Sequence, residues 1–147
     1  MKTESEQNDV LLNERKKIDE ADSKILELFT ERMASAARIA EFKKPMRELL
    51  DIVTETQPNA TIYLISLAPV GRETPMNIAY NPANTALYSQ AIKDLAREYG
   101  TEYLDVFRPL ADSEGYFLDV YNAGDGIHIK PKEYPVIEDF LRCNTGS

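Results

Sequence analysis

The stretch Thr61-Ile62-Tyr63-Leu64-Ile65-Ser66-Leu67 is a short and nearly continuous apolar run. Such a run is typical of a β-strand that is buried on both faces of a parallel sheet. A break at residues 57–59 (Gln-Pro-Asn) precedes the run. Residues 68–84, which are rich in Pro and Asn, follow it and form a loop long enough to suggest a function. We therefore expect a buried strand at residues 61–67.

The segments around this strand alternate between helical and extended patterns. Residues 46–56 have an amphipathic helical pattern, with Pro45 suited to the first turn. Residues 85–99 are helical in composition and stop at Gly100, a residue suited to a helix C-cap. A second strand is expected at residues 102–107 and a final helix at residues 131–142. This order predicts an α/β fold with a parallel sheet.

Residues 10–44 contain no Gly or Pro, and apolar residues recur at multiples of seven at Leu11, Ile18, Ile25 and Ile39. This seam predicts one helix of roughly 33 residues, about 50 Å long. A compact domain of this size has a radius of gyration of only ~15 Å, so its own domain cannot cover the seam. We therefore expect a homo-oligomer, with a disordered acidic tail at residues 1–9 and the α/β unit at residues 45–147.

The composition narrows the possible partners. The net charge is −8, and the 17 Lys and Arg form no basic run among 25 acids, so neither nucleic acid nor an anionic membrane is expected. The single cysteine, Cys143, cannot form a disulfide within the chain, which favours a reducing compartment. No segment has the apolar content of a signal peptide or of a membrane span. These features predict a cytoplasmic protein; a secreted protein whose signal peptide has been removed would show the same features.

His128 is the only histidine, and Asp125 precedes it by three residues in the run Gly-Asp-Gly-Ile-His. The two glycines allow a tight loop in which the carboxylate can contact the imidazole. Such a carboxylate fixes the tautomer of a catalytic histidine and stabilises the imidazolium that forms when it accepts a serine proton. The spacing alone favours a structural loop over a catalytic pair, because this short pattern is common.

Four segments, in this order along the chain, resemble the second half of SGNH (GDSL-type) ester hydrolases: residues 46–50, 57–71, 103–107 and 125–134. The resemblance implies a truncated, flavodoxin-like parallel sheet unit. It also implies that Asp125 and His128 correspond to the family's catalytic acid and base. Members of that family hydrolyse acyl esters, often acetyl esters, through a serine acyl-enzyme.

The family's nucleophile and oxyanion motifs have no counterpart in this chain. None of the six glycines begins Gly-Asp-Ser or Gly-x-Asn-Asp. Ser66 falls in a predicted strand and Ser89 in a predicted helix, and neither position provides the sharp turn that a nucleophile needs. We therefore expect no significant esterase activity from the isolated chain. The missing strands should also leave the 61–67 strand at an open edge, which favours pairing or swapping between subunits.

The first predicted helix carries three cations of interest. At about 100° per residue, Lys43 lies about 20° from Arg32 around the helix, so both could bind one dianion, whereas Arg15 points elsewhere. Solvated charges are the simpler interpretation. Residues 11–28, together with Glu31, Arg32 and residues 39–43, are similar to the first helix of all-helical chorismate mutases. That resemblance implies substrate binding by Arg15, Arg32 and Lys43 across an intertwined dimer, although the other helices are absent.

We expect no metal or other cofactor, because the chain has one His, one Cys and no Gly-rich phosphate loop. Three hypotheses remain: a fragment of an ester hydrolase, an oligomerisation module, and chorismate mutase-like anion binding. The first hypothesis implies a small ester as the ligand, and the third implies a dicarboxylate. A recombined or chimeric gene would explain why two incomplete enzyme patterns meet near Pro45.

Overall fold

The computed structural model describes residues 3–72 and 81–146. The chain forms two compact units, Met1–Glu41 and Phe42–Ser147. Residues 73–80, which belong to the loop predicted at 68–84, lie outside the described residues.

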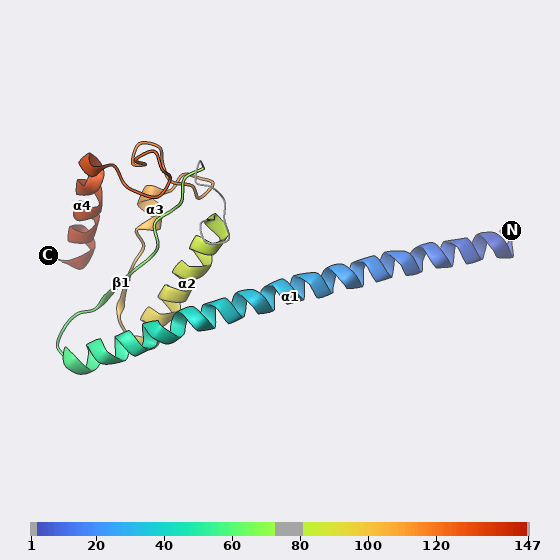
Figure 1. Cartoon of the computed structure of the whole chain (residues 1–147), viewed down its shortest axis with the longest axis horizontal. Helices are drawn as coiled ribbons and strands as arrows, with labels where there is room; N and C mark the ends of the chain where they lie inside the picture. Colours follow the sequence, from blue (N-terminus) through green and yellow to red (C-terminus); the bar gives the residue numbers. More distant parts are fainter. Residues whose placement is uncertain (1–2, 73–80, 147) are drawn as a thin grey trace. The chain divides into compact units, whose positions relative to one another are not determined.

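One helix, α1, extends from Glu4 to Thr56 and contains Pro45 (Figure 1). The two helices expected at residues 10–44 and 46–56 are therefore one continuous helix, which also includes residues 4–9. Proline cannot donate the helical hydrogen bond to the carbonyl four residues earlier, at Glu41. Both Glu41 and Pro45 are exposed, so water can reach the carbonyl that loses its partner. This exposure allows the helix to continue through a residue that usually ends one.

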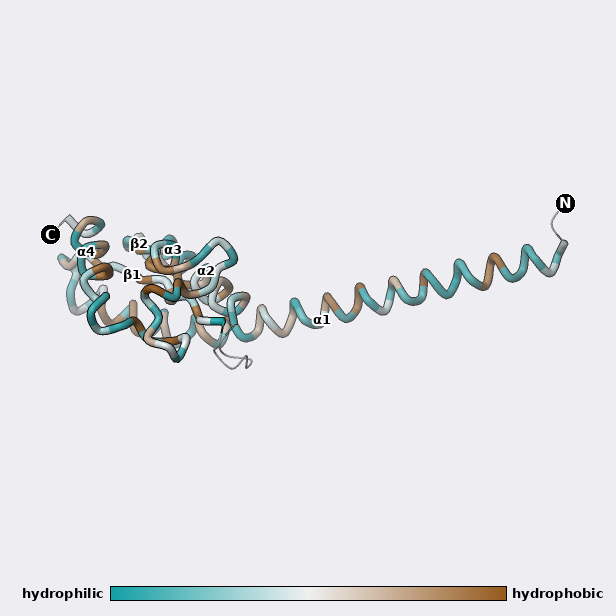
Figure 2. Tube along the Cα trace, turned by 90° about the horizontal axis from the view of Figure 1, so that it is seen from above, coloured by the Kyte–Doolittle hydropathy of each residue, from teal (hydrophilic) through white to brown (hydrophobic). Residues whose placement is uncertain are grey.

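In the first unit, α1 leaves its large apolar side chains exposed. Figure 2 shows apolar residues recurring along this helix. Between 49% and 66% of the surface of each of these residues is accessible: Val10, Leu11, Leu12, Ile18, Ile25, Leu26, Leu28, Phe29 and Met33. The apolar seam expected from the sequence is therefore uncovered in the single chain.

In the second unit, two short strands form a parallel sheet. β1 (Tyr63–Ile65) pairs with β2 (Glu102–Leu104), with Leu64 opposite Tyr103. The prediction of a parallel α/β unit is confirmed. The prediction that the first strand is buried on both faces is wrong, because Ile65 is 43% exposed. The physical reason is that β1 has a strand neighbour on one side only among the described residues.

Helix α2 (Pro82–Tyr99) connects the two strands and is capped at both ends. The side chain of Asn81 accepts a hydrogen bond from the Asn84 N–H at 2.8 Å, which satisfies one free amide of the first turn. At the other end Gly100 adopts a left-handed conformation (φ 65°), as its predicted role as C-cap requires. The prediction of this helix is confirmed, with a start three residues earlier than expected.

The remaining elements are α3 (Phe107–Leu110), the short 3-10 helix η1 (Pro131–Glu133) and α4 (Tyr134–Thr145). Figures 1 and 2 show α2 and α4 on either side of the strands. The buried apolar side chains come from the end of α1, from the segment after β1, from α2, and from β2 with the segment after it: Leu50, Val70, Ala91, Ile92, Leu95, Ala96, Leu104, Val106, Leu110 and Phe117. This small core supports the loop that carries Asp125 and His128.

Within residues 3–72 and 81–146, no helix combines the length and the apolar content needed to span a membrane.

Candidate active site

The loop between residues 122 and 129 is organised by the side chain of Asn122, which is 6% exposed. Its Oδ1 atom accepts hydrogen bonds from the N–H groups of Gly124 at 2.9 Å and Gly126 at 3.0 Å. Both glycines have positive φ angles, 106° and 75°, which only glycine adopts easily. An isolated antiparallel bridge between Asn122 and Ile129 closes the loop. The Asp-x-x-His segment is therefore held in one tight conformation.

Within this loop, Asp125 and His128 form the contact that their spacing suggested. Asp125 Oδ2 lies 2.5 Å from His128 Nδ1, and Asp125 Oδ1 accepts hydrogen bonds from the N–H groups of Ile127 and His128. These bonds, those from His128 first, hold the pKa of the Asp125 carboxyl well below its ordinary value. An ionised carboxylate can only accept, so Nδ1 carries a proton, and Nε2 is the ring nitrogen left to exchange a proton with a reacting group.

The imidazole is open to solvent, with 72% of its side chain exposed. In the part of the chain that the structure describes, Asp125 is the one hydrogen-bond partner of the imidazole. The loop is tied to the segment after β1, because the Gly71 N–H donates to the Gly126 carbonyl at 2.7 Å. Asp125 and His128 are thus positioned at the carboxyl end of β1, facing water.

The two serines considered as nucleophiles are engaged elsewhere. Ser66 is 6% exposed, and its Oγ accepts hydrogen bonds from the N–H groups of Val106 at 3.0 Å and Phe107 at 3.2 Å. Ser89 Oγ accepts one from the Leu67 N–H at 3.1 Å. Both hydroxyls therefore stabilise the connection between the sheet and its neighbouring segments.

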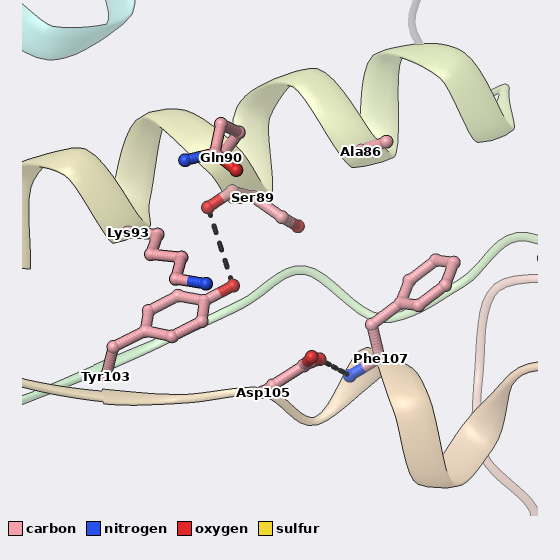
Figure 3. A pocket seen from close by; sticks show the side chains of 7 residues that line it. All are labelled: Ala86, Ser89, Gln90, Lys93, Tyr103, Asp105 and Phe107. Carbon is pink, nitrogen blue, oxygen red and sulfur yellow. Dashed lines mark hydrogen bonds between the residues drawn. The ribbon is translucent and has the colours of Figure 1, made fainter.

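A cavity of about 180 Å³ lies between α2 and β2, and Figure 3 shows the side chains that line it. Lys93 lies 5.9 Å from the centre of the Tyr103 ring, and the Asp105 carboxylate accepts a hydrogen bond from the Phe107 N–H. Partial burial, followed by the negative charge of Asp105, raises the pKa of Tyr103 above its ordinary value. Neither Asp125 nor His128 lines this cavity. It is therefore separate from the Asp125–His128 pair.

The cations singled out in the sequence all lie on α1. Arg15 and Arg32 are exposed in the first unit, and no ion pair involves either within the described residues. Lys43 belongs to the second unit, where its Nζ lies 3.5 Å from an oxygen of Asp94. Arg47 makes a similar contact with Glu98 at 2.9 Å. The binding role of Arg15, Arg32 and Lys43, and the chorismate mutase resemblance, stay predictions.

Asn122 and Ser66 were not singled out by the sequence as loop-forming residues. The Asn-Ala-Gly run at residues 122–124 is a recognisable signal, because Asn side chains often accept hydrogen bonds from amides that follow in a turn. No comparable pattern marks Ser66, whose role depends on the approach of a segment 40 residues away.

Comparison with known proteins identifies the family. The family model of the GDSL-like Lipase/Acylhydrolase family matches residues 8–134. The chain belongs to this family. The match includes most of α1, which the sequence motifs alone had not connected with the hydrolases. No curated protein sequence matches the chain.

Several solved structures are similar to the chain, among them the following two. One is described as "a putative platelet activating factor from Streptococcus pneumonia"; it has 26% identity and a TM-score of 0.64, and the match covers 71% of this chain and 50% of that one. The other is the esterase domain of the ZfL2-1 ORF1 protein from a zebrafish retrotransposon, with 15% identity, a TM-score of 0.60, and coverage of 74% of this chain and 63% of that one. The chain therefore spans half of the first structure and less than two thirds of the second, and the second similarity concerns the fold alone.

Proposed function

We propose that this chain carries the acid–base pair of an acyl ester hydrolase, with His128 as the general base and Asp125 as the residue that orients it. The observation that carries the proposal is the 2.5 Å contact between Asp125 Oδ2 and His128 Nδ1 in a member of an acylhydrolase family. Serine acyl transfer uses the same pairing of a carboxylate with Nδ1, which leaves Nε2 for the nucleophile.

In the proposed reaction, a hydroxyl oxygen attacks the acyl carbonyl carbon while its proton passes to His128 Nε2. Asp125 stabilises the imidazolium that results. The C–O bond to the alcohol then breaks, and the leaving oxygen takes the proton from Nε2. A water molecule repeats the sequence on the acyl-enzyme, releasing the carboxylic acid and restoring the hydroxyl.

The chain by itself does not place such a hydroxyl beside His128 within the described residues. We therefore propose that the isolated chain has no significant esterase activity. Ser66 and Ser89 support this proposal, because both accept hydrogen bonds from backbone amides elsewhere in the unit. Without a nucleophile, the base has no proton to remove.

The test is the hydrolysis of p-nitrophenyl acetate by the full chain, by His128→Ala and by Asp125→Ala. We expect the three proteins to release p-nitrophenolate at the same rate, close to that of buffer. The Ser66→Ala variant serves as a matched control for an intramolecular nucleophile. Multiple-turnover hydrolysis by the wild-type chain that disappears in His128→Ala contradicts the proposed inactivity.

A second function, homo-oligomerisation, is favoured by the exposed apolar side chains of α1. Pairing of this helix with a second copy would remove residues such as Leu11, Ile18 and Ile25 from water, and full burial of such a side chain contributes about 1.5–3 kcal/mol. Light scattering should then give a dimer mass for the wild type and a monomer mass for Ile18→Glu. The matched control is Ser23→Glu, which adds the same single negative charge at an exposed polar position of the same helix. A wild-type monomer at high concentration contradicts this function.

A further inference from the structure

The outer edge of β1 carries backbone groups that find no partner in the described chain. In a parallel pair, alternate residues of a strand direct both their N–H and C=O groups to the same neighbour. The Glu102 N–H donates to Ile62 O at 3.0 Å, and the Ser66 N–H donates to Leu104 O at 2.9 Å, so the even-numbered residues bond to β2. Tyr63 and Ile65 therefore direct their N–H and C=O groups away from β2. No hydrogen bond from residues 3–72 or 81–146 reaches these groups.

The side chains at this edge are also suited to burial. Ile65 is 43% exposed and Leu67 is 41% exposed. Edge strands that must remain in water usually carry charged residues or proline, which prevent another strand from pairing with them. Residues 61–67 contain neither. The edge therefore has the character of an interior strand that lacks one neighbour.

The same edge leads directly to the Asp125–His128 loop. After β1 the chain passes Val70, whose carbonyl accepts a hydrogen bond from the Phe117 N–H at 3.0 Å, and Gly71, whose N–H donates to Gly126 O. A strand added parallel to β1 would lie about 4.8 Å from it and would end at this same side of the sheet. In parallel α/β sheets the carboxyl ends of the strands form the functional side.

We propose that the open edge of β1 binds a parallel strand of a second polypeptide, which brings a nucleophilic hydroxyl and amide donors to the side of the sheet where His128 lies. This inference rests on the proposed ester-hydrolysing function. The size of the relatives supports it, because the matched part is only half of the Streptococcus pneumonia chain. The other half of that chain has no counterpart in the match.

A second copy of this chain fits the edge less well. Two identical strands that pair about a twofold axis run antiparallel, so their carboxyl ends point in opposite directions. Each His128 would then lie beside the amino end of the partner's β1 rather than its carboxyl end. Such a pair would cover the edge without completing the site.

The experiment is co-expression of the tagged full-length chain with a defined probe, namely the half of the Streptococcus pneumonia chain outside the match. Co-purification and light scattering report binding, and p-nitrophenyl acetate reports turnover. Ile65→Pro removes the outward N–H without touching the ladder to β2, and Ile65→Lys places a charge at the edge. The matched control is Val120→Lys, since Val120 is an apolar residue with 56% exposure outside the strands. Circular dichroism verifies that every variant is folded.

We expect a one-to-one complex with the wild type and with Val120→Lys. Both Ile65 variants should bind the probe with an affinity at least roughly tenfold lower than that of the wild type. Turnover by the complex should require His128. The absence of a complex, or a complex that both Ile65 variants leave unchanged, overturns strand addition. If the chain binds to itself and Ile65→Lys abolishes this self-association, the edge is occupied by a second copy, and the proposal of a different polypeptide is overturned. A complex that depends on Ile65 but hydrolyses no ester supports strand addition and contradicts the proposed function.

Discussion

Replacing Asn122 by alanine tests whether one buried amide organises the Asp125–His128 loop. The substitution removes the acceptor that the N–H groups of Gly124 and Gly126 share. Loss of a buried hydrogen-bond partner costs about 1–3 kcal/mol, and we expect a loss near the middle of this range because one of the two donors, the Gly126 N–H, is buried and the other is not. For the second unit, Phe42–Ser147, about 2 kcal/mol lowers the melting temperature by roughly 9 °C.

The assay is thermal unfolding followed by circular dichroism, with Asn144→Ala as the control. Asn144 makes a side-chain hydrogen bond of its own, since its Nδ2 donates to the Phe140 carbonyl at 2.8 Å, but it is exposed. Its substitution should change the stability by less than about 0.5 kcal/mol. NMR of the His128 ring should show a changed environment in Asn122→Ala alone. Equal melting temperatures for the two variants would refute the role assigned to Asn122.

Three further predictions concern titration and packing. Because hydrogen bonds lower the pKa of Asp125, its ionised form stabilises the fold above the ordinary carboxyl pKa of ~4, and this contribution is lost as the pH falls through the lower folded value. Chemical denaturation should therefore show Asp125→Asn to be less stable than the wild type at neutral pH, with the difference vanishing in strong acid. The hydrogen bond to Asp51 raises the pKa of Tyr99 to about 12, so ultraviolet titration of the eight tyrosines should contain a late phenol ionisation that Tyr99→Phe removes. Ser66→Ala should cost about 1–3 kcal/mol in urea unfolding, because the buried Val106 N–H loses its acceptor.

The sequence predicts the elements of the second unit whose causes are local. Helix α2 follows from its composition and from Gly100, since a left-handed C-cap requires a residue without a side chain. The parallel pairing of β1 with β2 follows from the intervening helix, because a strand–helix–strand connection returns the chain in the same direction. In each case the sequence pattern that predicts the element lies within the residues that form it or connect it.

The sequence-based predictions were wrong where the local structure depends on solvent exposure or on neighbouring segments. Pro45 usually ends a helix, but an exposed carbonyl at Glu41 makes the lost hydrogen bond tolerable, and exposure is not visible in a local pattern. The apolar run at residues 61–67 predicts burial on both faces, whereas burial requires neighbours on both sides. The contact between Asp125 and His128 could be predicted because the two residues are three positions apart in a loop with two glycines.

The outward-facing peptide groups of Tyr63 and Ile65 also affect how the pure protein behaves in concentrated solution. An apolar edge without a charged residue is a template on which any extended chain can stack, including partly unfolded copies of the same chain. Precipitation should therefore accelerate steeply as samples are concentrated. The residues that specify the sheet are thus also those that limit the shelf life of the purified chain.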